Sequence, residues 1–253
     1  MTDAWTAAQI RAAEKPLLEA GEPLMQRAAD GLAGVVSGLL RASSAPRILL
    51  LVGSGDNGGD ALYAGASLAQ EFVPGGLVTV VPTGSRLHEA GLAAALVAGA
   101  TVDALGPWTD PAAAPGLLRE YDVMIDGMVG TGASGGLRGD ARRVVAALGG
   151  GAGSVGEGAG AGFVGPGAGG PGPSGPSGPS GPVLGRPLVV AVDLPSGLHP
   201  DDGSAELVLP ADVTVTFGGR KAGLLRGSGP MLAGRVVLID IGLRLGAPEL
   251  STP

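Results

Sequence analysis

The chain has 253 residues, of which 45% are hydrophobic and none is cysteine, and it carries a net charge of −7. This length and composition suffice for one large α/β domain with a buried core. The lack of cysteine excludes disulfides, thiolate catalysis and cysteine zinc sites, and the negative charge opposes nonspecific nucleic-acid binding. The first residues do not resemble a signal peptide, and no stretch approaches 18 apolar residues, so we expect a cytoplasmic protein without membrane contact.

Two helices are predicted before the first long strand. Residues 6–15 are expected to form a short helix that ends at Pro16. A second helix is expected to begin near Pro23, and its apolar residues recur at helical spacing along one face. Such a stripe indicates core packing, with a dimer surface as the alternative.

The stretch from Arg47 to Leu62 combines a strand, a glycine-rich loop and a helix. Residues 48–52 form an unbroken apolar run, which is typical of a strand buried on both faces of a parallel sheet. The following residues are rich in glycine, and a helix is predicted from Asp60, which we interpret as its N-cap. The unit resembles the phosphate-binding corner of a doubly wound sheet, although it matches neither the standard dinucleotide nor the P-loop fingerprint. A tight structural turn is the alternative.

Five more apolar runs predict further strands, giving about six parallel strands with helices between them. The runs cover residues 77–81, 121–126, 187–193, 213–217 and 235–240. Three strand ends carry polar, glycine-containing loops, and these are expected to meet in one pocket at the carboxyl edge of the sheet. Residues 149–182 are rich in Gly, Pro and Ser and are interpreted as a disordered surface insertion in a single domain spanning residues 1–253.

Four motifs taken together are more specific than any one of them. GSGDNGGDAL, DGMVGTG, AVDLPSG and TFGGRKAG occur in this order, and they resemble the motifs of the NAD(P)H-hydrate epimerase family, the YjeF N-terminal domain. The resemblance extends from the N-terminal helices to about Gly242. It implies a Rossmann-like three-layer α/β/α sandwich with a mostly parallel sheet. It also implies a homodimer that interconverts the R and S forms of hydrated NADH and NADPH, here called NADHX and NADPHX.

The resemblance also implies residue roles. Asp193 corresponds to the carboxylate that reaches the substrate and is the candidate acid/base. A potassium ion is implied at Asn57, Asp126 and Ser196, whose oxygen atoms suit a hard monovalent cation. The implied substrate-binding residues are Asp56, Asn57, Gly58, Gly59, Asp60, Gly130, Thr131, Gly132, Ala133, Ser134, Gly135, Gly136 and Asp193. Lys221 is expected to be an exposed loop lysine, and no basic residue is clearly placed to select NADPHX over NADHX.

The chemistry follows from the substrate that the resemblance implies. A hydroxyl beside the ring nitrogen can leave with help from the nitrogen lone pair, and water can then re-enter the planar iminium from either face. One carboxylate could supply the proton and take it back. Ring opening and reclosure is a second route, and the sequence does not choose between them.

Some residues depart from the family pattern. Asp56 replaces an asparagine and adds negative charge where a diphosphate is expected. A non-catalytic dimerisation or scaffold module is an alternative, because domains related to this family also occur as scaffolds, although this chain keeps Asn57, Asp126, Asp193 and Ser196. Another alternative is a nucleotide-dependent transferase whose phosphate loop is residues 130–136. The dehydratase that acts on the S epimer is expected to be a separate protein.

Overall fold

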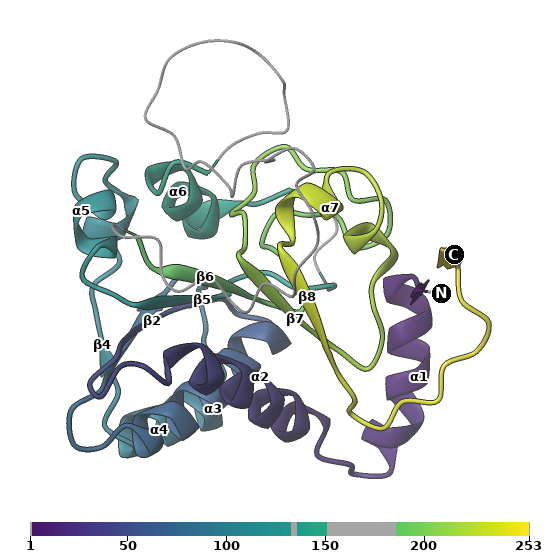
Figure 1. Ribbon diagram of the computed structural model, residues 1–253, viewed down its shortest axis with the longest axis horizontal. Coiled ribbons are helices and arrows are strands. Elements are labelled where there is room, and N and C mark those ends of the chain that lie inside the picture. Colours follow the sequence, from purple (N-terminus) through teal and green to yellow (C-terminus); the bar gives the residue numbers. More distant parts are fainter. Residues whose placement is uncertain (1, 133–135, 151–185, 253) are drawn as a thin grey trace, which may run out of the picture.

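A seven-stranded, all-parallel sheet forms the centre of the computed structural model, which describes residues 2–132, 136–150 and 186–252 (Figure 1). The strand order is β4-β3-β2-β5-β6-β7-β8. The strands are β2 (Arg47–Val52), β3 (Leu77–Pro82), β4 (Thr101–Val102), β5 (Val123–Gly127), β6 (Leu188–Val192), β7 (Val213–Phe217) and β8 (Arg235–Ile239). Most of the insertion predicted at residues 149–182 lies outside the described residues, so that prediction stays untested.

Helices cover both faces of the sheet, which confirms the three-layer α/β/α prediction. The helices on one face are α2 (Leu24–Leu40), α3 (Asp56–Glu71) and α4 (Glu89–Val97), and those on the other include α5 (Ala114–Leu118) and α6 (Gly139–Ala147) (Figure 1). Strand β2 divides its side chains between the two layers. Ile48 and Leu50 belong to the core cluster with α2 and α3, whereas Leu49 and Leu51 belong to the cluster with α6. The continuous apolar run is therefore explained by burial on both faces.

Shorter elements complete the described fold and had no clear sequence signal. They are the short helices η1 (Gly106–Thr109), η2 (Ala222–Leu224) and α7 (Gly229–Leu232), and the antiparallel strands β1 (Thr2–Ala4) and β9 (Leu250–Thr252). Pairing of β1 with β9 brings the two ends of the chain together (Figure 1). In the described part of the chain, no helix combines the length and apolar character needed to cross a membrane.

Helix α1 (Ala7–Glu19) continues beyond Pro16, so the prediction that this proline ends the helix was wrong. Proline removes one N–H donor, but the following turn still forms, with the Ala20 N–H donating to the Pro16 carbonyl at 3.1 Å. The helix ends at Glu19. Gly21, two residues later, has a φ of 77°, which is favourable for glycine, and the Glu22 N–H donates back to the Leu17 carbonyl at 2.9 Å. This pattern is a Schellman C-terminus.

Helix α3 begins earlier than predicted. Its N-cap is Gly55 and its first residue is Asp56, so the interpretation of Asp60 as the N-cap was wrong. Gly58 allows the early start, because a Cβ at this position would overlap the carbonyl oxygen of Gly53 at the end of β2. The segment 56–60 is therefore the beginning of a helix rather than a loop.

Candidate active site

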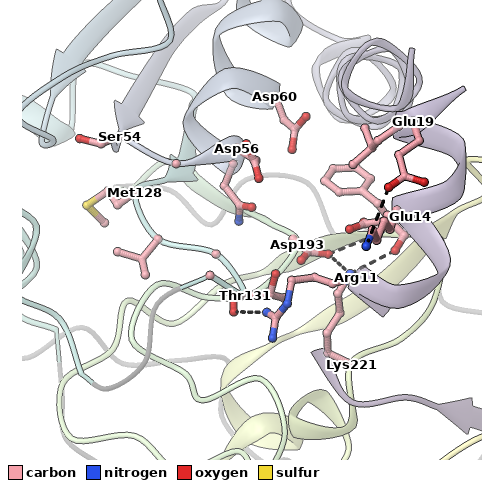
Figure 2. Close-up of a pocket in the computed structure, with 18 residues that line it drawn as sticks. Arg11, Glu14, Glu19, Ser54, Asp56, Asp60, Met128, Thr131, Asp193 and Lys221 are labelled. Carbon is pink, nitrogen blue, oxygen red and sulfur yellow. Dashed lines mark hydrogen bonds and ion pairs between the residues drawn. The ribbon is translucent and has the colours of Figure 1, made fainter. Parts of the chain in front are cut away.

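A cavity of about 830 Å³ opens at the carboxyl edge of the sheet, where the loops after β2, β5, β6 and β7 meet (Figure 2). This confirms that the glycine-containing loops converge. The lining residues are Arg11, Glu14, Lys15, Leu18, Glu19, Ser54, Gly55, Asp56, Asn57, Asp60, Met128, Val129, Gly130, Thr131, Gly132, Asp193, Phe217 and Lys221. In open α/β sheets, ligands bind at this edge.

The predicted substrate-binding residues divide into groups. Asp56, Asn57, Asp60, Asp193 and residues 130–132 line the cavity, whereas Gly58 and Gly59 lie inside helix α3 and do not. Gly136 lines a separate, smaller cavity beside His199. Ala133, Ser134 and Gly135 lie outside the described residues.

Asp193 has an unusual backbone conformation. It directly follows β6 and has a φ of 68°, which non-glycine residues rarely adopt. The Leu194 N–H donates to the Val192 carbonyl at 2.8 Å, so Asp193 is the central residue of a tight γ-turn. Such backbone strain costs on the order of 1–3 kcal/mol and persists where the surroundings hold it.

The side chain of Asp193 is held by one of its two oxygen atoms. Oδ1 accepts hydrogen bonds from the Thr216 hydroxyl at 3.0 Å and the Phe217 N–H at 3.3 Å, and it forms an ion pair with Lys221. No hydrogen bond from the described residues reaches Oδ2. One oxygen is therefore anchored, and the other is available to a molecule in the cavity.

Lys221 is buried, with only 2% of its surface exposed, so the prediction of an exposed loop lysine was wrong. Besides Asp193, its ammonium donates to the Phe217 carbonyl at 3.1 Å and to the Thr216 hydroxyl at 3.3 Å. Burial of a charged amine requires such partners. Lys221 thus belongs to the immediate surroundings of the Asp193 carboxylate, which the sequence alone did not indicate.

Asp126 and Ser196 are hydrogen-bonded to each other, and neither is among the residues that line the cavity. The Ser196 hydroxyl donates to Asp126 Oδ1 at 2.6 Å, and the Ser196 amide donates to Oδ2 at 2.8 Å. Asp126 is fully buried, and this burial raises its pKa to about 6, although the bonds from Ser196 and the Met128 amide lower it. The Val129 amide donates to Ser196 Oγ at 3.0 Å, so the network also fixes the loop after β5.

Asn57 connects helix α3 to two of the other loops. Its amide group donates to the Val192 carbonyl, directly before Asp193. A Cβ on Gly130 would overlap the Asn57 side chain, so the glycine allows the loop after β5 to pass close to the amide.

The three residues predicted to hold potassium fit a monovalent cation by their chemistry. Asn57, Asp126 and Ser196 offer amide, carboxylate and hydroxyl oxygens, which are hard donors. Burial and hydrogen bonds account for the pKa of Asp126, with no contribution from a lysine or arginine. A bound cation would supply the compensation that a buried carboxylate otherwise lacks.

Helix α1 forms a wall of the cavity that the sequence analysis did not predict. The Arg11 guanidinium donates to the Thr131 carbonyl at 2.9 Å, which joins the helix to the loop after β5 (Figure 2). Trp5, two residues before the helix, positions its start: the Trp5 amide donates to the Arg220 carbonyl at 2.8 Å, and the Trp5 carbonyl accepts from the Ala222 amide at 2.8 Å. These bonds flank Lys221, so the position of α1 depends on a segment more than 200 residues away in sequence.

The chain is similar to proteins of one known family. A family model described as YjeF-related protein N-terminus matches residues 21–157 and 172–223. A protein of Clavibacter michiganensis subsp. michiganensis named NAD(P)H-hydrate epimerase is 44% identical over 255 residues, which cover 99% of this chain and 95% of that protein. A protein of the same name from Microbacterium testaceum is 42% identical, with 95% of this chain and 78% of that protein covered.

A longer relative and a solved structure add to these matches. A protein of Mycobacterium tuberculosis named bifunctional NAD(P)H-hydrate repair enzyme Nnr is 34% identical, and the match covers 95% of this chain but 42% of that protein. The crystal structure titled yeast ynu0, YNL200c, has a TM-score of 0.64 at 15% identity and covers 98% of this chain and 97% of that chain. That likeness supports the fold.

Proposed function

The chain belongs to the family of YjeF-related N-terminal proteins, and we propose that it is an NAD(P)H-hydrate epimerase that interconverts the R and S forms of NADHX and NADPHX. The identity of 44% with a relative of this name, over nearly the whole of both chains, supports the activity. The observation that carries the proposal is the placement of Asp193 in the cavity with one anchored oxygen and one available. A degenerate scaffold module would not require this arrangement.

The reaction needs proton transfer at one hydroxyl group. In the iminium route, the C–O bond breaks, the ring nitrogen stabilises the planar cation, and water adds to the other face. Asp193 Oδ2 is the atom that we assign to this proton transfer, because Oδ1 is occupied by Thr216, Phe217 and Lys221. General acid–base catalysis by one positioned group contributes about 10²–10⁴-fold.

A potassium ion bound through Asn57, Asp126 and Ser196 is part of the proposal. Its positive charge would offset the buried carboxylate and favour an anionic diphosphate nearby. The residues that line the cavity include five carboxylates against three basic side chains, so an anionic ligand needs such compensation. The first amides of α3, beginning at Asp56, offer further N–H donors to a phosphate.

The remaining expectations also belong to this proposal. We expect a homodimer in the cytoplasm, and a separate dehydratase that acts on the S epimer. The bifunctional name of the Mycobacterium tuberculosis relative supports a link to a second repair activity.

The proposed function is tested by following the epimer composition of an R-enriched NADHX sample by chromatography, with and without the protein. We expect the protein to accelerate equilibration, and Asp193→Asn to remove most of this acceleration. Replacing potassium by a noncoordinating cation is expected to slow the wild-type protein. Equilibration at the spontaneous rate in the presence of the protein would contradict the proposal.

A further inference from the structure

Asp60 is a buried carboxylate that the mechanism above does not use. Only 6% of its surface is exposed, and it lies in the second turn of α3 rather than at its N-terminus. No hydrogen bond from the described residues reaches its carboxyl group. The Asp60 side chain lines the cavity. Figure 2 shows that it projects from helix α3, whereas the Asp193 side chain projects from the loop after β6.

The surroundings of Asp60 favour a neutral carboxylic acid. Burial raises its pKa well above the ordinary range, and the negative charges of Asp193, Asp56 and Glu14 raise it further, while Lys221 lowers it. The titratable groups that face Asp60 therefore come from α1, from the start of α3 and from the loops after β6 and β7. Asp193 differs because it is ion-paired with Lys221. The same cavity thus holds one carboxylate paired with an ammonium group and one whose surroundings favour the protonated form.

Epimerisation requires proton transfer on both faces of the ring, which a single fixed carboxylate cannot reach. The hydroxyl must leave from one face of the ring, which requires an acid, and water must add to the other face, which requires a base. Asp193 is anchored by Oδ1 through several bonds and cannot move from one face to the other without breaking them. A second proton-transfer group on another wall of the cavity removes this difficulty.

We propose that Asp60 and Asp193 act as a pair of acid/base residues, each serving one face of the hydrated nicotinamide ring. This inference rests on the proposed epimerase function. In one direction Asp60 gives its proton to the substrate hydroxyl, the C–O bond breaks with its electron pair going to water, and the nitrogen lone pair forms the iminium bond. Water then adds to the opposite face and gives a proton to Asp193. One proton has moved from Asp60 to Asp193, and exchange with solvent restores both groups.

The test uses NADHX in water enriched in ¹⁸O, at a pH where the uncatalysed reaction is slow. Interconversion of R and S is measured together with ¹⁸O entry into each epimer, for the wild-type protein, Asp60→Asn and Asp193→Asn. We expect each variant to lose interconversion tenfold or more, because inversion needs both residues. In each variant the remaining carboxylate can still release and return water on its own face of the ring, so we expect ¹⁸O exchange into one epimer to persist. Because the two carboxylates serve opposite faces, Asp60→Asn and Asp193→Asn should keep exchange into different epimers.

Glu71→Gln is the matched control, because it removes a carboxylate from the same helix at a position that contacts Ser37 outside the cavity. It is expected to keep both activities, and thermal unfolding checks that all variants are folded. The inference would be overturned if Asp60→Asn reduced interconversion by less than tenfold. It would also be overturned if Asp60→Asn abolished ¹⁸O exchange into both epimers. If the wild-type protein does not accelerate epimerisation, the proposed function itself fails, which is a different result.

Discussion

The buried pair of Lys221 and Asp193 is the residue-scale feature on which the site depends. The Asp193 carboxylate directly follows β6 in a strained γ-turn, and Lys221 neutralises it in a region where both side chains are less than a tenth exposed. The pair also explains why the sequence misled us about Lys221, since its partner is 28 residues away and its burial depends on tertiary packing. The loop position of Lys221 in the sequence gives no information about its contact with Asp193.

Lys221→Met is expected to lower the free energy of unfolding by about 3–5 kcal/mol, because it leaves a buried carboxylate without its counterion. The measurement is urea denaturation of the variant and the wild-type protein. The double variant Lys221→Met/Asp193→Asn is the control, and it should regain most of the stability while remaining inactive. A single variant within about 1 kcal/mol of the wild-type protein would contradict the structural role of the pair.

The buried carboxyl group of Asp126 is expected to make the stability of the protein depend on pH. Burial raises its pKa to about 6 from an ordinary 3.8, so the folded state binds a proton that the unfolded state releases in this range. Without potassium, the contribution of Asp126 to stability is therefore lost as pH rises from about 4 to about 6, by as much as about 3 kcal/mol. We expect the stability of Asp126→Asn, relative to the wild-type protein, to increase by this amount between pH 4 and pH 7.

Asp60 and Glu14 also have raised pKa values, and both the wild-type protein and Asp126→Asn retain them. Their contributions to the pH dependence of stability therefore cancel when the two proteins are compared. Denaturant unfolding at several pH values in potassium-free buffer provides the measurement. Added potassium should reduce the pH dependence, because a cation beside Asp126 favours the ionised form. A constant stability difference across the potassium-free series would show that Asp126 does not titrate in this window.

At the scale of elements, the close approach of the loop after β5 to helix α3 requires glycine at position 130. Gly130→Ala is expected to displace the Asn57 side chain, since the added Cβ would overlap it. Epimerase activity should fall at least tenfold while the protein stays folded, because the change affects the cavity rather than the core.

Gly116→Ala is the matched control, because its Cβ would meet no atom within 4 Å and it lies in α5, away from the cavity. This variant should retain wild-type activity. The measurement is the initial rate of NADHX epimerisation, with circular dichroism to monitor folding. Equal activity of the two variants would contradict the proposed role of Gly130.

The elements differ in how well the sequence predicts them. Strands β2, β3, β5, β6 and β7 were predicted because apolar runs report burial on both faces. Strand β8 was also predicted from an apolar run, although it lies at the edge of the sheet and its residues are half-buried or exposed. The start of α3 was missed, because its glycines suggest a loop, whereas the structure uses Gly58 to let the helix begin close to β2. Strand β4 contains only two residues, which is too short for a pattern to indicate.

The contribution of α1 to the cavity was also beyond the sequence analysis. Its capping box at Thr6 and the glycine after its C-cap, Gly21, are local signals that predict a helix. Its position depends instead on pairing between Trp5 and the segment around Lys221, which no local pattern reports. The residues Arg11 and Glu14 therefore became site candidates only in the structure.

At the scale of the whole molecule, the parallel sheet brings together residues from distant parts of the chain. Asn57, Asp126 and Asp193 each come at or just after the carboxyl end of a neighbouring strand, which is why their convergence was predictable from the motif positions. The sequence could not predict how the surroundings of Asp60 and Asp193 differ. That difference depends on burial and on the position of Lys221, which is paired with Asp193.

The proposed epimerase interconverts R and S in both directions. The direct measurement starts from two NADHX samples, one enriched in R and one in S, and follows both by chromatography with the protein in potassium buffer. We expect both samples to converge rapidly on the same R/S ratio without loss of total NADHX. Convergence no faster than in protein-free samples, or consumption of one epimer alone, would contradict it.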